Sequence, residues 1–373
     1  MHAQRERRNN NLANLQSLRG VAVLMVVCLH LLGYGGKYFP HIILPSWFLA
    51  GGAGVDLFFV ISGFIITWIT FDLDSSWRTA LSFAVRRAMR IYPLYWALFL
   101  VLLPVVAARP EWINAASGHN VDLLASFLLL PQLIPPILPV AWTLTHELYF
   151  YLIYACLILL PHHLRSWGLV AWLAAVATAY FLQPLTSWFY ITGSSGSESA
   201  SQIVISHPAT FEFGIGCLVA YLVGKWQFQI PRIAVLAAVG ILGGAACLVY
   251  VGSGVAPLVH ALLLGSAAGI LVWFAVAADL RGERAFPSWF RWLGDISYSV
   301  YLLHVLVISA VGRLFHALVA TGPLWQLAFV AAALCLIGGL GSLSFSHIEK
   351  RAISAGRVFG SYIEGGRAKV GLT

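Results

Sequence analysis

The chain has 373 residues, of which 60% are hydrophobic and only 10% are charged, and it carries a formal net charge of +8. Soluble domains have roughly 25% charged residues, so this composition excludes a soluble globular protein and indicates a polytopic membrane protein. The positive charge indicates contact with the lipid bilayer and not with nucleic acid, because the basic residues flank the apolar segments and do not form a separate basic domain.

Apolar segments of spanning length recur from one end of the chain to the other. A hydrocarbon core about 30 Å thick requires about 20 apolar residues in a helix. This rule predicts an all-α bundle of ten transmembrane helices, at 19–36, 51–70, 91–108, 140–160, 167–185, 203–223, 233–251, 257–278, 296–316 and 324–345. The stretch 121–137 is shorter and contains three prolines, so we expect it to be a re-entrant or interfacial segment.

The basic residues give the orientation of these spans. With ten spans and a cytoplasmic N-terminus, all but three of the 22 Lys and Arg residues lie on the cytoplasmic side; the exceptions are Lys37, Arg109 and Arg313. A missing or additional span would destroy this asymmetry. We therefore predict that both termini are cytoplasmic and that residues 1–373 form one membrane domain, with short basic tails at 1–18 and 346–373.

The cysteines give no sign of a metal centre. All five fall within predicted spans and none belongs to a CxxC pair: Cys28, Cys156, Cys217, Cys247 and Cys335. This pattern argues against disulfides and zinc. We expect no metal site and no permanently bound cofactor.

Arg19 and His30 are the most informative polar residues of the first span. Eleven positions separate them, which returns to the same helix face and places His30 about 16 Å deeper than Arg19. An ionisable group at mid-depth in a membrane is costly, so it is a functional-site hypothesis by default. His30 is therefore the leading catalytic candidate.

Other ionisable residues share this predicted layer. Glu147, Glu212 and His304 lie about eight or nine residues into their spans, and Asp56 enters the second span nearer the outer side, within predicted reach of His30. Glu212 and His304 are equally suited to hydrogen bonds between packed helices, so their role stays open.

Arginines are concentrated at the cytoplasmic end of the third span, in the segment RRAMRIYP. Arg86 and Arg90 are one helical turn apart, so both guanidinium groups can converge on one anion, with Arg87 and Tyr92 beside them and Arg19 on the same membrane face. The use of Arg throughout favours bidentate phosphate recognition. The alternative is that these residues only anchor the topology.

Six segments, in the same order along the chain, resemble the integral-membrane acyltransferase 3 family, which acylates sugars and other hydroxyl-bearing acceptors. They are SLRGVAVLMVVCLH, GVDLFFVISGFII, RRAMRIYPLYW, WTLTHELYFYL, FEFGIGCLVAY and LGDISYSVYLLH. The resemblance covers nearly the whole chain. One departure is that the family often has Trp-Ser-Leu where this chain has Trp142-Thr143-Leu144, which retains the hydroxyl.

The resemblance implies roles for individual residues. It implies that His30 is the catalytic base or an acyl-relay residue and that Arg19 is its essential partner. It places the arginines near the acyl donor and adds residues of the other motifs to the candidate site: Asp56, Ser62, Gly63, Trp142, Glu147 and Tyr298. Asp56 or Glu147 is expected to orient the imidazole of His30.

These observations predict a membrane O-acyltransferase. We expect it to move an acyl group, most often acetyl in such enzymes, from cytoplasmic acyl-CoA to a hydroxyl of a cell-surface or lipid-linked carbohydrate, in the cytoplasmic membrane of a bacterium. The alternative is a transporter or flippase for a lipid-linked glycan, which would also have mid-membrane carboxylates. The hydropathy pattern shows no internal repeat, which argues against the alternative.

The predicted topology can be tested with introduced cysteines. In a background whose native cysteines are shown to be unreactive, Gly118→Cys and Ser195→Cys should react with an impermeant thiol reagent added outside the cell, and Ser75→Cys should not. Labelling of Ser75→Cys from outside would rule out the ten-span topology.

Overall fold

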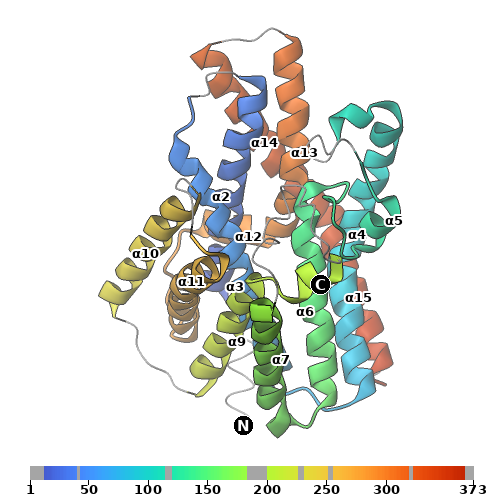
Figure 1. Ribbon diagram of the computed structural model, residues 1–373, viewed down its shortest axis with the longest axis vertical. Helices are drawn as coiled ribbons and strands as arrows, with labels where there is room; N and C mark the ends of the chain where they lie inside the picture. The colour runs from blue at the N-terminus through green and yellow to red at the C-terminus, as the bar shows by residue number, and fades with distance from the viewer. Residues whose placement is uncertain are drawn as a thin grey trace. The chain divides into compact units, whose positions relative to one another are not determined.

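The computed structural model describes residues 12–39, 43–113, 120–182, 200–225, 231–250, 255–318 and 322–365. Within these ranges the regular structure is helical and contains no β-strand (Figure 1). The predicted all-α class is therefore confirmed. Positions 118 and 195, chosen for the labelling test, lie outside the described residues, whereas Ser75 lies within them.

Eight segments of the described chain are long and apolar enough to cross a membrane. They correspond to α2 (Ala13–Tyr38), η1 with α3 (Ser46–Gly52 and Ala53–Thr70), α4 (Trp77–Ala108), η4 with α6 (Pro139–Ala141 and Trp142–Leu159), α7 (His162–Leu182), α11 (Pro257–Leu280), α13 (Ser297–Ala317) and α14 (Pro323–Ser344), the last continuing through a π-turn (η5, Phe345–Glu349) into α15 (Lys350–Ile363). The other two predicted spans overlap helices α9 (Ala209–Lys225) and α10 (Arg232–Tyr250), which are not among these eight. The predicted span 203–223 is interrupted between residues 205 and 209, where one helix ends and α9 begins. The protein is thus an integral multi-pass membrane protein.

The remaining helices are short. They are η2 (Pro110–Trp112), α5 (Leu123–Leu128), α8 (Ala200–Ile205) and α12 (Ser288–Asp295). Helix α5 falls in the proline-containing stretch 121–137 and is followed by its C-cap residue Leu129, which adopts the left-handed conformation (φ 55°). A helix of six residues is far too short to span a membrane, as the prolines predicted.

The chain is divided into two compact units. Unit 1 comprises Met1–Ile69 and Pro208–Leu343, and unit 2 comprises Thr70–His207 and Ser344–Thr373.

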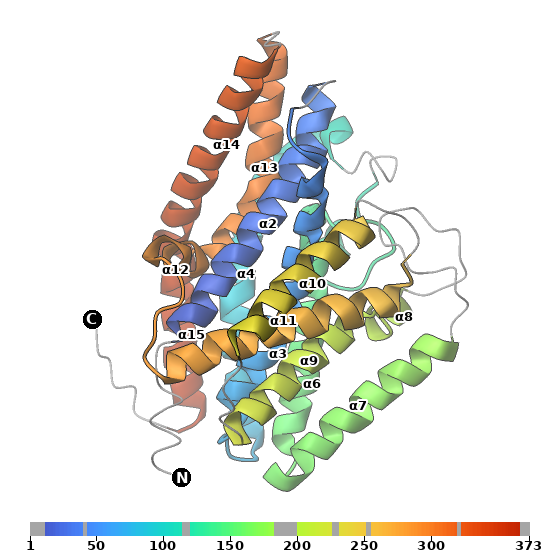
Figure 2. The same ribbon diagram turned by 90° about the vertical axis from the view of Figure 1, so that its left-hand side faces the viewer.

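In unit 1, helix α2 packs against η1, α11, α12 and α13, and α11 packs in turn against α9 and α10 (Figure 2). The start of α2 is capped by α11: the Asp279 carboxylate accepts hydrogen bonds from the backbone N–H groups of Asn14 (2.8 Å) and Leu15 (3.2 Å). These N–H groups have no partner within α2, and a carboxylate also stabilises the positive end of the helix dipole. The capping interaction therefore joins α2 to the end of α11.

In unit 2, helix α4 packs against α6 and α15, and α6 packs against α7. Arg165 of α7 is only 8% exposed, and its guanidinium donates to the carbonyl groups of Thr70 (3.1 Å), Leu73 (2.7 Å) and Ile158 (3.1 Å). These carbonyls lie at helix ends or in the adjoining loop, where no further helical N–H is available to them. Arg165 thus joins the segment between α3 and α4 to the end of α6. This structural role is separate from the predicted role of Arg165 as a cytoplasmic anchor.

Both segments that we expected to be basic tails contain helix. Segment 1–18 contains the start of α2, at Ala13. Segment 346–373 contains most of η5 and all of α15, and α15 packs along α4. Gly356 and Gly360 of α15 face Met89 and Arg86 of α4, so the two helices approach closely. Residues 350–363 therefore belong to the folded part of unit 2.

Glycines bring α3 and α9 together in unit 1. A Cβ atom on Gly63 would collide with the carbonyl oxygen of Phe213, and one on Gly216 would collide with that of Val60. The thiol of Cys217 donates to the Gly63 carbonyl (3.6 Å) at the same contact. The glycine of the second-span motif is thus explained by close helix packing.

We predict that Gly63→Ala lowers the thermal unfolding temperature, because backbone at the contact cannot move aside for the added methyl group, a strain of about 1–3 kcal/mol. Gly33→Ala on α2 is the control, since no atom lies within 4 Å of the position of its Cβ. Equal unfolding temperatures for the two variants in detergent would contradict the packing account.

Candidate active site

Two histidines of unit 1 form the centre of the candidate site. His30 of α2 and His304 of α13 have ring centroids 4.8 Å apart in an edge-to-face arrangement, and Nε2 of His304 lies 3.2 Å from Nδ1 of His30. His304 is fully buried and His30 is half-buried. The structure thus joins His304, whose role the sequence left open, to the leading catalytic candidate.

The hydrogen bonds of this pair assign the protons on both rings. Nδ1 of His30 lies 2.9 Å from the Val26 carbonyl and Nδ1 of His304 lies 3.2 Å from the Val300 carbonyl. A carbonyl only accepts, so each Nδ1 carries the proton. Nε2 of His304 is then the acceptor that faces Nδ1–H of His30.

This assignment leaves a lone pair on Nε2 of His30. That atom makes no hydrogen bond to any residue that the structure describes. A neutral imidazole with Nδ1 held as donor and Nε2 available is the form that acts as a base or nucleophile. His304 therefore helps to hold His30 in a reactive tautomer.

Aromatic rings of unit 1 adjoin the histidine pair. Tyr34 is 5.8 Å from the ring of His30, Tyr301 is 5.8 Å from that of His304, and Phe58 of α3 contacts Tyr301 at 5.9 Å. Tyr298 lies on the same helix, α13, and is buried. Ser62 of α3 is half-buried.

Arg19 and His30 both lie on the continuous helix α2, as their spacing predicted. Nη1 of Arg19 donates to Oε1 of Gln16 (3.2 Å), one turn earlier. Eleven residues of helix separate Arg19 from His30 by about 16 Å along the axis. Arg19 therefore acts on His30, if at all, through other groups or through a substrate.

A second polar cluster of unit 1 contains Asp56 of α3, Glu212 of α9 and His260 of α11. Nε2 of His260 lies 2.6 Å from Oδ1 of Asp56. We expected Asp56 or Glu147 to orient His30; the structure shows Asp56 paired with His260. Sequence reasoning overlooked His260, although a lone histidine in the apolar segment PLVHALLL is a signal of the same kind as His30.

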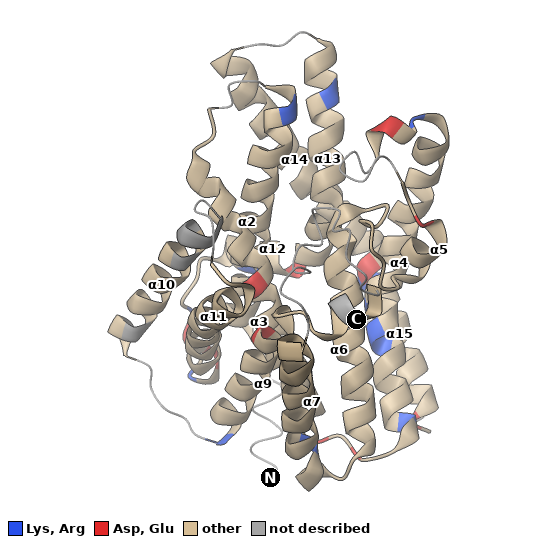
Figure 3. Cartoon of the chain, viewed as in Figure 1, with Lys and Arg blue, Asp and Glu red and all other residues tan. Residues whose placement is uncertain are grey.

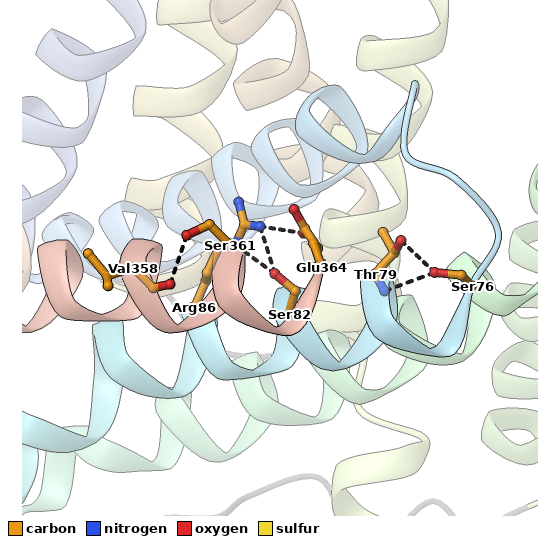
Figure 4. A network of polar contacts seen from close by, with 7 residues as sticks. All are labelled: Ser76, Thr79, Ser82, Arg86, Val358, Ser361 and Glu364. Carbon is orange, nitrogen blue, oxygen red and sulfur yellow. Dashed lines mark hydrogen bonds and ion pairs between the residues drawn. The ribbon is translucent and has the colours of Figure 1, made fainter. Parts of the chain in front are cut away.

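Charged residues are sparse on the helices (Figure 3), and α4 in unit 2 carries the arginines of the segment RRAMRIYP. Arg86 donates from Nε (3.0 Å) and Nη2 (2.6 Å) to the hydroxyl of Ser82 and forms an ion pair with Glu364, which directly follows α15 (Figure 4). The side chains of Arg86 and Glu364 are 41% and 38% exposed. The Glu364 carboxylate thus binds the guanidinium group of Arg86, which we expected to bind a phosphate of the donor.

The neighbouring Arg87 is directed into unit 2. Its guanidinium lies 5.4 Å from the ring centroids of both Phe83 and Tyr151, and its Nε is buried without a hydrogen-bond partner among the described residues. The Tyr151 hydroxyl donates to Glu147. Arg86 and Arg87 therefore have different surroundings, while Arg90 lies one turn beyond Arg86 on the same helix, as predicted.

Two aromatic candidates also belong to unit 2. Tyr92 of α4 donates its hydroxyl to the Leu128 carbonyl (3.0 Å), which joins α4 to α5. Trp142, the first residue of α6, lies 5.4 Å from His146 and 5.8 Å from His207. Tyr92 is thus held by a hydrogen bond, and Trp142 packs against two imidazole rings.

The fold and the histidine pair define a polytopic membrane protein with a site suited to group transfer. The acyltransferase domain model of the acyltransferase 3 family matches residues 12–341, and the chain belongs to this family. It is a membrane O-acyltransferase, as the sequence motifs predicted. No solved structure matches the chain.

Curated relatives agree with this assignment. The chain is 29% identical to the exopolysaccharide production protein ExoZ of Rhizobium meliloti (strain 1021) over 321 residues, covering 83% of this chain and 92% of ExoZ. It is 27% identical to the peptidoglycan O-acetyltransferase OatA of Listeria monocytogenes (90% of this chain, 55% of OatA) and to the acyltransferase MdmB of Streptomyces mycarofaciens (76% and 74%). The chain thus spans about half the length of OatA and most of ExoZ.

Proposed function

We propose that this protein transfers an acyl group, most simply acetyl, from cytoplasmic acyl-CoA to a hydroxyl of a cell-surface or lipid-linked carbohydrate in the cytoplasmic membrane of a bacterium. The observation that carries the proposal is the lone pair on Nε2 of His30, with Nδ1 held as a donor by Val26 and His304. A carbohydrate acceptor is supported by the names of the relatives ExoZ and OatA, which refer to exopolysaccharide and peptidoglycan.

In the direct form of the reaction, Nε2 of His30 accepts the proton of the acceptor hydroxyl. The oxygen attacks the thioester carbonyl, the new C–O ester bond forms, the C–S bond breaks, and the CoA thiolate takes the proton from the imidazolium. The positive charge on His30 is delocalised toward Nδ1–H, where the Val26 carbonyl and Nε2 of His304 accept. We expected Asp56 or Glu147 in this orienting role; we now assign it to His304, because its Nε2 lies 3.2 Å from Nδ1 of His30.

In the relay form, Nε2 of His30 attacks the thioester itself. The C–S bond breaks, and an Nε2-acyl-imidazolium and the CoA thiolate form. The acceptor oxygen then attacks the acyl carbon, the bond between that carbon and Nε2 breaks, and the hydroxyl proton passes to Nε2 and from there to the thiolate. Both forms use the same lone pair. Acid quench and mass spectrometry of the protein with acyl-CoA alone distinguish them, since only the relay form adds an acyl mass without acceptor.

We assign donor binding to the arginines of α4. Arg86 and Arg90 present planar guanidinium groups that suit the phosphates of acyl-CoA. Glu364 then competes with the donor for Arg86, because the carboxylate and a phosphate bind the same guanidinium edge. Tyr92 lies within two residues of Arg90, on the side of the helix that meets α5.

The alternative that the sequence left open was a flippase, which belongs to another class of protein. The family assignment and the absence of a hydropathy repeat favour the enzyme. An enzyme releases free CoA from acyl-CoA only when acceptor is present, whereas a flippase moves its cargo without consuming a thioester.

Mass spectrometry of surface glycans from cells with and without the protein identifies the acceptor by its acyl mass difference.

We predict that Glu364→Gln lowers the KM for acyl-CoA and that Arg90→Lys raises it, because the first change frees Arg86 and the second removes a planar fork while keeping the charge. A lost bidentate contact corresponds to about tenfold in KM, or about 1.4 kcal/mol. Steady-state kinetics of CoA release at varied donor concentration measure both. Glu111→Gln, an exposed carboxylate of the η2 turn, is the control. Unchanged KM values in both variants would leave the arginines as topological anchors only.

We further predict that His30→Ala abolishes transfer while the protein still folds and binds acyl-CoA. Loss of a general base costs roughly 10²–10⁴-fold in rate, and loss of a covalent relay is complete within assay limits. His304→Ala should lower kcat without changing the donor KM, and His304→Gln should recover part of the loss, because its amide oxygen accepts from Nδ1–H of His30. Near-normal turnover by folded His30→Ala would refute the mechanism.

A further inference from the structure

Asp56, Glu212 and His260 converge from three different helices of unit 1. Each is the fourth residue of its helix, in α3, α9 and α11 respectively. One ligating atom from each residue lies within 4.8 Å of the other two. This convergence depends on close helix packing, since a Cβ atom on Gly265 of α11 would lie 3.2 Å from Cγ of Glu212.

The cluster carries more negative charge than its own side chains can neutralise. Asp56 is 4% exposed and Glu212 is 3% exposed, and only one imidazole accompanies the two carboxylates. That imidazole lies beside Asp56, at 2.6 Å. Oε2 of Glu212 is buried and has no hydrogen-bond partner among the residues that the structure describes. A buried polar atom without a partner is costly and requires an explanation.

We propose that Asp56, Glu212 and His260 bind a divalent transition-metal ion, Zn²⁺ or Mn²⁺. One imidazole nitrogen and two carboxylate oxygens form a donor set that suits both ions. The ion takes the place of the proton between His260 and Asp56, binds Oε2 of Glu212, and balances both negative charges. The side chain of His260 is 21% exposed, so the three residues do not enclose the ion completely and leave room for a further ligand.

The site differs from the histidine pair in its residues and in what it does. The ion joins the first turns of α3, α9 and α11. No disulfide links these three helices within the part of the chain that the structure describes, so the ion is a cross-link between them. Binding to the folded state only would stabilise unit 1 in proportion to the ion's affinity. The competing explanation is a proton shared by the two carboxylates, which also removes one negative charge but leaves no metal in the protein.

The experiment measures metal content and stability, and not activity. The full chain is purified in mild detergent, without a polyhistidine tag, from cells grown with added zinc and manganese, and bound metal is counted by mass spectrometry. We expect about one ion per chain, loss of thermal stability with EDTA, and recovery on adding Zn²⁺ or Mn²⁺. Removing a residue that only hydrogen-bonds a metal ligand typically weakens metal binding by roughly 10–100-fold. Glu212→Gln and His260→Ala each remove a direct ligand, so we expect them to weaken metal binding by more than this.

His316→Ala is the matched control, because this histidine lies in the last turn of α13 and belongs to neither cluster. It should retain the metal. Folded wild-type protein with no bound metal and no thermal stabilisation by either ion would overturn the proposal and leave the shared proton as the explanation. The wild-type measurement decides the question even if Glu212→Gln fails to fold. Because no acyl transfer is assayed, the result is independent of the proposed function.

Discussion

The hydrocarbon core of a membrane offers no water, so each polar group placed there must find its partner within the protein. The described helices meet this requirement at several places. Asp279 caps the first N–H groups of α2, Arg165 binds carbonyls at helix ends, and His304 accepts from His30. The contact between His304 and His30 supplies such a partner and also holds the candidate catalytic ring in a defined tautomer.

Helix geometry explains how much of this could be predicted from the sequence. Apolar segment length gave the helical class, and the helical repeat placed Arg19 and His30 on one helix and Arg86 and Arg90 one turn apart. Each of these predictions concerns residues within a single helix. A one-dimensional pattern is sufficient for them because the spacing of residues along a helix is constant.

Contacts between helices were beyond such reasoning. Asp56 was expected beside His30 and is paired with His260, and Arg86 binds Glu364, a residue 278 positions away. These pairings depend on the crossing angle and rotation of packed helices, which no period in the sequence specifies. The charge of residues 346–373 suggested a tail for a related reason: an amphipathic helix such as α15 resembles a basic tail in composition, and only its packing on α4 distinguishes the two.

The two histidine-containing clusters of unit 1 differ in a way that bears on their roles. His30 is accompanied by another neutral imidazole and a carbonyl, so its Nε2 is available to a substrate without an ionic partner that would favour the protonated ring. Nε2 of His260 instead lies 2.6 Å from the Asp56 carboxylate, in a cluster that also contains Glu212. A base or nucleophile for acyl transfer needs a nitrogen lone pair that a substrate can reach. Nε2 of His30 meets that condition and Nε2 of His260 faces Asp56, and this contrast is the physical reason for assigning the chemistry to His30 and a bound cation to the cluster around His260.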